Sequence, residues 1–276
     1  MGISKWLDKK TVIVTGASSG MGKDITKRLI MEKDCKVIGI ARSEKKMEAL
    51  VDELGMYSDK FSYKLFDVSD KDNWTEFAEY LRENDIHPDV LINNAGILPR
   101  FSRFDKYSIE EIESAMQINF FSCVWAMHTL LPILLESDEP AIINVDSSAA
   151  LMALAGTSVY SASKAALKSL TEALREELRG KCYVGIVCPG FTKTDIFRNQ
   201  HADGGEKAFD MISTPCDKMV NWIMSGIGRK KELMVLGKDA VAMDIFGRLL
   251  PVTGSRLFSQ VMKISKLPLF DEVFKN

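Results

Sequence analysis

Short apolar runs alternate with longer helix-periodic segments along most of the chain. The short runs are rich in β-branched residues and almost continuously apolar, which is typical of strands covered on both faces. The predicted strands are Thr11–Thr15, Lys36–Ile40, Phe61–Phe66, Val90–Asn93, Ala141–Val145, Tyr183–Cys188 and Glu232–Leu236. The predicted helices between them are Met21–Lys33, Glu44–Leu54, Lys71–Asn84, Glu110–Glu136 and Val159–Arg179. This alternation, with right-handed crossovers, predicts an α/β fold: a doubly wound parallel sheet of about seven strands with helices on both faces.

Two features of the sequence bear on its domain organisation. The sequence holds no internal repeat and no Gly/Ser linker, so we expect a single domain over residues 1–276. Residues 191–213 follow the sixth strand and have loop composition, which makes them a candidate substrate loop. Thr214 and Pro215 then offer an N-cap and a first helical position for a helix over Cys216–Gly226.

Composition and charge exclude several classes of protein. With 46% hydrophobic and 27% charged residues, the chain resembles soluble globular proteins. Its net charge of −2 gives no basic footprint, so we expect no nucleic-acid partner. The longest apolar run, Phe120–Leu135, falls short of the roughly 18–20 residues that a membrane-spanning helix needs. Five cysteines without a CxxC pair, and no recognisable leader, favour reduced thiols and a cytoplasmic localisation.

A glycine-rich turn joins the first predicted strand to the first predicted helix. In Thr15-Gly16-Ala17-Ser18-Ser19-Gly20-Met21-Gly22, Gly16 allows a tight turn and Gly20 lets the backbone approach a pyrophosphate. Gly22 permits close packing of the helix on the strand. The helix N-terminus offers free N–H groups and a positive dipole end to phosphates. The sequence therefore predicts a dinucleotide site at this turn.

The end of the second strand indicates which dinucleotide is bound. A site for NAD typically has an acidic residue here that accepts hydrogen bonds from the adenosine ribose. This chain has Arg42 instead, in Ile40-Ala41-Arg42-Ser43, and no acid. A guanidinium is a permanently charged fork that pairs well with a 2′-phosphate. We therefore expect NADP(H) as the cofactor.

Four motifs in this order resemble those of the short-chain dehydrogenase/reductase family. They are the glycine-rich turn, Asn93-Asn94-Ala95-Gly96, Tyr160-Ser161-Ala162-Ser163-Lys164, and Cys188-Pro189-Gly190. The resemblance extends from about Thr11 to Leu236 and implies a Rossmann-type fold. It does not cover residues 237–276, which we expect to form a helical tail atypical of the family.

The resemblance implies a set of cofactor contacts. It would place Asp67 and Val68 on the adenine, Ser18 on the phosphates and Thr192 on the nicotinamide carboxamide, with Asn94 supporting the cofactor. Ser19 departs from those NADP-using members that carry a second basic residue there. The full predicted set is Gly16, Ser18, Ser19, Gly20, Met21, Gly22, Arg42, Asp67, Val68, Asn94, Ala95, Gly96, Tyr160, Lys164, Pro189, Gly190 and Thr192.

Tyr160 and Lys164 are the candidates for acid–base chemistry. Four residues apart, they share one face of the predicted helix. An ammonium beside a phenol favours the phenolate and so brings the pair towards useful acid–base strength. The resemblance implies that Lys164 also binds the nicotinamide ribose.

Two further polar groups complete the predicted catalytic set. Ser147 and Ser148 both qualify as the hydroxyl that polarises a substrate carbonyl; the family's spacing of 13 residues before the tyrosine selects Ser147 and leaves Ser148 as the alternative. Asp146 stands where the family often has a small polar residue. Asn119 matches the helix-kink asparagine that anchors a water in the proton relay. The three histidines lack metal-ligand spacing, so we expect no metal.

These residues predict an NADP(H)-dependent oxidoreductase that interconverts a ketone and a secondary alcohol. The apolar side chains predicted around the site favour a hydrophobic substrate such as a steroid, bile acid, retinoid or fatty-chain ketone, although ordinary core packing also accounts for them. They are Leu98, Phe101, Phe104, Leu151, Met152, Leu154, Phe191, Ile196, Phe197, Phe209 and Met211. The alternatives are a non-catalytic NADP(H)-binding sensor or scaffold and, within enzymes, an epimerase or dehydratase.

The tail and the long helices bear on partners. From Arg229 to Asn276 there are 9 Lys/Arg against 5 Asp/Glu. Packing of the tail on the subunit or across a dimer is favoured, and contact with a membrane surface is the weaker alternative. The resemblance makes Glu110–Glu136 and Val159–Arg179 the expected surfaces of a homodimer or homotetramer.

Overall fold

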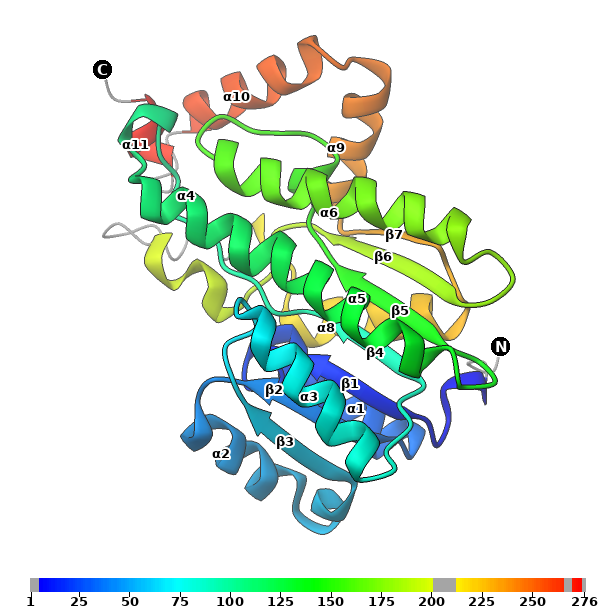
Figure 1. Cartoon of the computed structure of the whole chain (residues 1–276). Helices are drawn as coiled ribbons and strands as arrows, with labels where there is room; N and C mark the ends of the chain where they lie inside the picture. Colours follow the sequence, from blue (N-terminus) through cyan, green and yellow to red (C-terminus); the bar gives the residue numbers. More distant parts are fainter. Residues whose placement is uncertain (1–4, 201–211, 266–269, 275–276) are drawn as a thin grey trace.

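The computed structural model of the chain describes residues 5–200, 212–265 and 270–274. A parallel sheet of seven strands in the order β3-β2-β1-β4-β5-β6-β7 runs through its centre (Figure 1). The strands are β1 (Thr11–Thr15), β2 (Lys36–Ala41), β3 (Phe61–Leu65), β4 (Val90–Asn93), β5 (Ala141–Val145), β6 (Tyr183–Pro189) and β7 (Leu233–Leu236). The predicted doubly wound Rossmann-type sheet is confirmed, because every strand pairs in parallel and the order reverses between β1 and β4.

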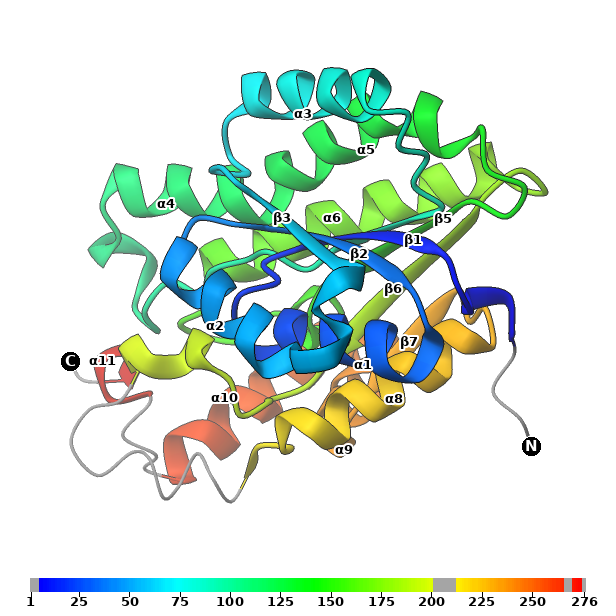
Figure 2. The same cartoon turned by 90° about the horizontal axis from the view of Figure 1, so that it is seen from below.

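Helices cover both faces of the sheet (Figure 2). One face carries α1 (Gly20–Lys33), α2 (Glu44–Leu54) and α8 (Cys216–Gly228), and the other carries α3 (Lys71–Glu83), α5 (Ser122–Leu134) and α6 (Ser158–Glu177). Each layer has its own apolar core, for example Ile25 and Met47 on the first face and Trp74 and Leu167 on the second. Strands buried on both faces explain the continuous apolar runs in the sequence.

The predicted helix Glu110–Glu136 is three segments in one rod. They are α4 (Ile109–Met116), a π-helical turn η4 (Gln117–Phe121) and α5. Over Ile109–Leu134 this rod is long and apolar enough to cross a membrane, contrary to the expectation from the shorter apolar run. One face of α5, including Ala126 and Leu130, is fully buried against the sheet, as in the core helix of an α/β protein.

The start of α8 differs from the prediction by one residue. Pro215 occupies the N-cap and Cys216 the first helical position, and the carbonyl of Pro215 accepts from the N–H of Met219 at 3.0 Å. Thr214 instead forms an isolated parallel bridge with Thr192. The bridge fixes the backbone of Thr214 in the loop after β6, where it cannot act as the cap.

The chain continues after β7 into α9 (Lys238–Leu249), α10 (Thr253–Ser265) and α11 (Asp271–Phe274). These helices lie together at one end of the molecule (Figure 1), where α9 contacts β7 and α10 contacts α9. Met243, Met262 and Phe270 are buried in a third apolar cluster together with Phe101 and Met152. The tail therefore packs on the subunit's own body, next to the loops that follow β4 and β5.

Candidate active site

The β1–α1 turn forms a cradle that only glycine can build. Gly16 and Gly20 have φ angles of 66° and 51°, in the left-handed region that favours glycine. A Cβ on Gly22 would overlap the carbonyl of Gly16 and the side-chain amide of Asn94. Ser19 is the N-cap of α1 and makes no side-chain capping hydrogen bond. The first-turn N–H groups of α1 therefore point at the place where a pyrophosphate would lie.

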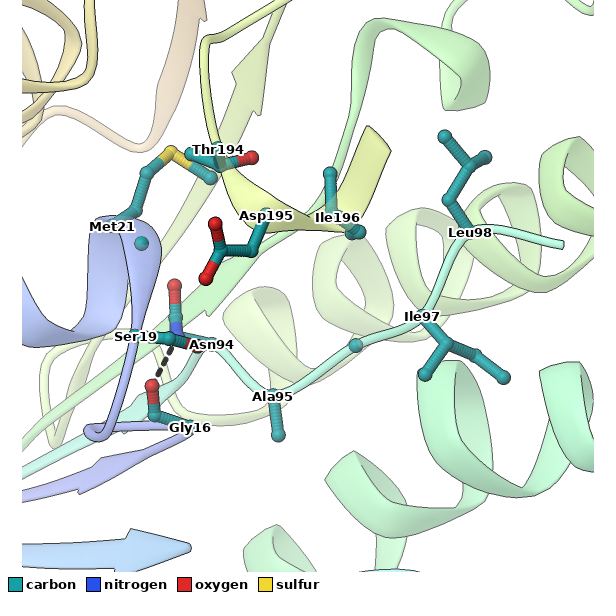
Figure 3. Close-up of a pocket in the computed structure, with 12 residues that line it drawn as sticks. Gly16, Ser19, Met21, Asn94, Ala95, Ile97, Leu98, Thr194, Asp195 and Ile196 are labelled. Atoms are coloured by element: carbon teal, nitrogen blue, oxygen red, sulfur yellow. Dashed lines mark hydrogen bonds between the residues drawn. The ribbon is translucent and has the colours of Figure 1, made fainter. Parts of the chain in front are cut away.

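A cavity of about 300 Å³ opens beside this turn (Figure 3). Asn94 ties its two walls together: its backbone N–H donates to Thr15 Oγ1 at 2.9 Å, and its side-chain amide donates to the carbonyls of Thr15 at 3.0 Å and Gly16 at 3.4 Å. The lining residues are Gly16, Ser19, Gly20, Met21, Asn94, Ala95, Gly96, Ile97, Leu98, Thr194, Asp195 and Ile196. The predicted cofactor residues of β1–α1 and of the β4 loop thus share one cavity.

A neighbouring cavity of about 160 Å³ lies at the ends of β2 and β3, where adenosine is predicted. Ser18, Arg42, Asp67 and Val68 all line it. Arg42 Nη1 lies 3.4 Å from Asp67 Oδ2, and Asp67 also accepts from the backbone N–H and hydroxyl of Ser69. Partial burial would raise the pKa of Asp67, but the hydrogen bonds from Ser69 and the charge of Arg42 outweigh it and lower that pKa.

The predicted catalytic serine and tyrosine line a separate, smaller cavity of about 50 Å³. Ser147 is half-buried, and its Oγ accepts from the N–H of Ala149 at 3.1 Å, which starts the short helix η5 (Ser148–Ala150). Ser148 lines the same cavity, so the geometry leaves both hydroxyls beside Tyr160. The other lining residues are Leu98, Phe101, Ala149, Leu154, Thr157, Gly190, Phe191, Phe197 and Met243.

Lys164 lies beneath Tyr160 on α6 with only 4% of its surface exposed. Its Nζ donates to the carbonyl of Val145 at 3.1 Å and lies 6.0 Å from the centroid of the Tyr160 ring. Burial would lower the pKa of Lys164, but negative charge on Tyr160 and on Asp146 outweighs this and raises that pKa. The ammonium therefore stays charged next to the phenol.

Asn119 sits in the π-helical turn and is fully buried. Its Oδ1 accepts from the N–H of Ile97 at 2.8 Å, and its Nδ2 donates to the carbonyl of Ile97 at 2.9 Å and to Ser163 Oγ at 3.1 Å. The predicted irregularity of the helix at Asn119 is present, since a π-turn shifts the hydrogen-bond ladder by one residue. The side chain thus joins the helix to the loop after β4.

The backbone at Gly96 is where the nucleotide and catalytic groups converge. A Cβ on Gly96 would meet Asn119 Oδ1 at 3.2 Å and Lys164 Nζ at 3.7 Å. Because Gly96 also lines the 300 Å³ cavity, Asn119 and Lys164 stand at the inner wall of the nucleotide site.

The predicted residues after β6 lie close to these groups, but their contacts differ from one residue to the next. Gly190 lines the catalytic cavity beyond Pro189, the last residue of β6. Thr192 is buried, and its hydroxyl donates to the carbonyl of Gly190 at 2.9 Å. The end of the predicted substrate loop, with Phe209 and Met211, lies outside the described residues.

Sequence reasoning missed Asp239, at the start of α9. Its carboxylate accepts from the N–H of Phe191 at 2.7 Å, and a Cβ on Gly190 would overlap it. Burial raises the pKa of Asp239, although the hydrogen bond from Phe191 opposes the shift. Asp239 fixes the loop after β6 to the tail, and no spacing rule links an acid after the seventh strand to that loop.

Asp146, which stands where the family often has a small polar residue, has unusual surroundings. It is 4% exposed, and neither carboxylate oxygen has a hydrogen-bond partner among the described residues. Burial raises the pKa of Asp146 to about 8, although the charges of Lys164 and Lys168 oppose the shift. A buried, unpaired carboxyl group thus stands directly before the candidate catalytic serine.

Comparison with known proteins decides the family. A family model described as short chain dehydrogenase matches residues 10–204, well over half of the chain. The chain belongs to the short-chain dehydrogenase/reductase family. As a member it is an oxidoreductase that acts on CH–OH groups.

The similarity to individual relatives extends over most of the chain. The ketoacyl reductase HetN of Nostoc sp. is 29% identical over 260 residues, which cover 91% of this chain and 89% of the relative. The NADP-dependent 3-hydroxy acid dehydrogenase YdfG of Escherichia coli O157:H7 is 32% identical over 196 residues, with coverages of 71% and 77%. The crystal structure of a short-chain dehydrogenase from Streptomyces avermitilis superposes with a TM-score of 0.76 at 26% identity, covering 94% of this chain and 98% of that one.

Proposed function

We propose that this short-chain dehydrogenase/reductase uses NADP(H) to interconvert a ketone and a secondary alcohol on a hydrophobic substrate. The observation that carries the proposal is that Tyr160 and Ser147 line one cavity, with the Lys164 ammonium 6.0 Å from the tyrosine ring and against the wall of the nucleotide cavity. A carbonyl oxygen in the smaller cavity would meet two hydroxyl donors at once.

The residues present fit a nicotinamide dinucleotide. Gly16 and Gly22 leave no room for a Cβ in the turn, and the N-terminus of α1 faces the cavity with its N–H groups. Asn94 and Gly96 would hold the nicotinamide end and Asp67 and Val68 the adenine end. When bound, the cofactor supplies or accepts the hydride.

Arg42 supports NADP(H) over NAD(H). The two residues directly after β2 are Arg42 and Ser43, neither of them acidic, and Arg42 keeps 67% of its side chain exposed while it borders the adenosine cavity. Its pair with Asp67, at 3.4 Å, is an exposed contact that contributes little. A 2′-phosphate would gain a charge-assisted, bidentate partner there. The Escherichia coli relative is NADP-dependent by name, which supports the same choice.

Proton transfer is assigned to Tyr160. The buried ammonium of Lys164 stabilises negative charge that develops on the phenol oxygen when Tyr160 gives its proton to a carbonyl oxygen. Ser147 would donate to the same oxygen and so orient the substrate. A relay water would bind near Asn119, whose Nδ2 donates both its hydrogens within the protein and whose Oδ1 accepts from Ile97.

The surroundings of the catalytic cavity support an apolar substrate. Leu98, Phe101, Leu154 and Met243 are buried around it, in the same cluster as the tail helices. A volume of about 50 Å³ holds little beyond the reacting group, whereas ligand pockets commonly reach about 300 Å³. A larger ketone would therefore displace Phe197 of η6 (Asp195–Gln200), a half-buried part of the wall.

The test is a Tyr160→Phe variant, with Tyr80→Phe on α3 as the matched control. We expect Tyr160→Phe to lower kcat for NADPH-dependent reduction of an apolar ketone by about a thousandfold, because the proton donor is lost. NADPH binding, followed by the fluorescence of the reduced nicotinamide, should stay within about twofold, since the hydroxyl contributes to chemistry more than to binding. Retained turnover would refute the role of Tyr160. NADPH binding by the wild type without turnover on a broad ketone panel would favour the sensor alternative.

A further inference from the structure

Exposed apolar side chains concentrate on the two long tail helices. Nine of the seventeen exposed large apolar side chains among the described residues fall between positions 241 and 264. On α9 they form a stripe of Val241, Ile245 and Leu249, at spacings of four residues. On α10 they form a second stripe of Leu257, Val261 and Ile264, of which Ile264 is 78% exposed. We call these six residues the α9–α10 surface.

The same two helices bury a different apolar face against the body of the protein. Ala240 and Met243 are buried on α9, and Gly247 lies so close to the loop after η5 that a Cβ would crowd the carbonyl of Leu151. On α10, Phe258 packs on the third apolar cluster and Met262 is buried in it. The inner faces therefore explain why the helices dock, but they do not explain the outer stripes. A soluble helix normally carries polar residues on its outer face.

The two helices that carry the α9–α10 surface also carry more basic than acidic residues. Arg256 and Lys263 on α10 have no ion-pair partner among the described residues, whereas Arg248 on α9 pairs with Asp244 at 2.7 Å. If another protein with a mixed surface of acidic and basic residues covered the stripes, we would expect both acidic and basic residues around them. The local excess of positive charge instead favours an anionic partner.

A groove next to the first stripe is also basic. It has a volume of about 820 Å³ and runs along the edge strand β7 between α8 and α9. Lys218, Arg229, Lys231 and Lys238 line it, and no described lining residue is acidic. Val241 belongs both to this groove and to the α9 stripe, so the two features are continuous.

We propose that the α9–α10 surface docks on a lipid bilayer that contains anionic phospholipid. The apolar stripes would enter the region between headgroups and acyl chains, and the cations of the groove and of α10 would face phosphate groups. A second copy of the chain fits less well, because a two-fold contact through this surface would bring like charges together. From the sequence alone, packing of the tail and contact with a membrane are alternatives. Because each helix has an inner and an outer apolar face, the tail can do both.

The arrangement gives an apolar substrate a short route. Met243 and Phe258 stand between the outer stripes and the cavity of Tyr160, on the inner faces of the helices. A ketone dissolved in the bilayer would reach the cavity through apolar contacts alone. This second part rests on the proposed function, whereas the docking itself does not.

The experiment is co-sedimentation of the full chain with vesicles, at low and high salt. Vesicles of phosphatidylcholine with phosphatidylglycerol are compared with pure phosphatidylcholine. We expect wild-type protein to bind the anionic vesicles about tenfold more tightly, and added salt to remove most of that difference. A Leu257→Ser/Val261→Ser/Ile264→Ser variant should lose binding by about tenfold or more. A control with three exposed apolar residues changed elsewhere, Met31→Ser/Met56→Ser/Ile109→Ser, should bind like wild type.

The outcomes separate docking from its alternatives. Thermal unfolding of each variant first shows that it is folded. Docking is refuted if wild type stays in the supernatant with anionic vesicles, or if both triple variants bind like wild type. It is refuted equally if the α10 variant turns an oligomer into a smaller species without vesicles, since a second copy would then cover the surface. Vesicle binding without reduction of any ketone would contradict the proposed function and leave docking standing; ketone reduction without vesicle binding would do the reverse.

Discussion

The nucleotide end of the sheet and the C-terminal tail are built on different physical principles. At the nucleotide end, backbone geometry determines which residue a position can have: position 22 requires glycine because there is no space for a Cβ beside Gly16 and Asn94. In the tail, Met243, Phe258 and Met262 serve through apolar volume, which many side chains could supply. Steric and hydrogen-bonding constraints require particular residues at particular positions, which can be recognised in a single sequence. Apolar packing requires only that some apolar residue be present. The first region is therefore the rigid half of the site and the second the adaptable half.

The largest expected effect is that of Lys164→Met at the rigid half. Removal of the buried ammonium takes away the charge that stabilises the phenolate of Tyr160, so kcat should fall by about a thousandfold. Steady-state oxidation of NADPH with an apolar ketone measures it. Lys168→Met, one turn further along α6 and paired with Glu172 at 2.6 Å, is the control and should lose much less. Equal losses in the two variants would mean that the charge of Lys164 has no special role.

Asp146→Asn tests the unpaired carboxyl group behind Ser147. The folded-state pKa of about 8 lies far above the ordinary value of 3.8 for an aspartic acid, so the native protein holds a proton that the unfolded chain releases. Stability from this group is therefore full below pH 4 and is lost as the pH rises towards 8. The amide of the Asn variant does not titrate, so its free energy of unfolding at pH 8 should exceed that of wild type by up to about 5 kcal/mol, at about 1.4 kcal/mol for each unit of pKa difference, with little difference near pH 4.

Thermal unfolding at several pH values checks this prediction. Asp138→Asn, at an exposed position, is the matched control and should change the profile by less than about 0.5 kcal/mol. A wild-type profile that is flat between pH 4 and 8, or an Asn variant that is less stable at pH 8, would show that Asp146 is charged and paired in solution.

Arg42→Ala sharpens the choice of cofactor. Loss of the guanidinium should raise the KM for NADPH by roughly ten- to thirtyfold, because a charge-assisted hydrogen bond contributes about 1.5–2 kcal/mol. The KM for NADH should change little, since NADH has no 2′-phosphate. Arg103→Ala, an exposed arginine paired with Asp105 at 3.0 Å, controls for a general loss of positive charge. A parallel rise for both cofactors would remove Arg42 from the 2′-phosphate site.

The smallest effect is expected at the adaptable half. Met243→Ala should change kcat/KM for an apolar ketone by about fivefold, since the apolar wall of a pocket contributes only modestly to discrimination. The KM for NADPH should be unaffected, because Met243 lines the catalytic cavity and not the nucleotide cavity. Leu249→Ser, on the outer face of the same helix, is the control for both constants. A change in the NADPH constant would contradict the division of the site into two halves.

The predictability of the fold reflects this division. Periodicity located all seven strands to within one residue at either end. The five inner strands are buried on both faces and so read as apolar runs, whereas the edge strands β3 and β7 are only partly buried. The long helix was predicted as one segment, since the π-turn at Gln117–Phe121 has no periodic signature of its own. The N-cap of α8 moved from Thr214 to Pro215 because a tertiary bridge to Thr192 holds Thr214.

The candidate site was predictable to the extent that its chemistry is local. Tyr160 and Lys164 lie four residues apart on one helix, and the spacing of the glycines marks the turn, so a single sequence is enough to single out these groups. Asp239 accepts a hydrogen bond from Phe191, 48 positions away in the sequence. The carboxylate of Asp146 lacks a hydrogen-bond partner among the described residues because of how distant segments pack around it. Neither property is encoded in neighbouring residues, and only the folded chain shows them.

The most direct test of the central claim is the oxidation of NADPH at 340 nm by the wild-type protein, over a panel of steroid-like and long-chain ketones. NADH is run in parallel, and the product alcohol is identified. We predict turnover with NADPH that exceeds turnover with NADH by at least about tenfold, with one secondary alcohol formed for each NADPH consumed. NADPH that binds tightly but is never oxidised by any ketone of the panel would contradict the account.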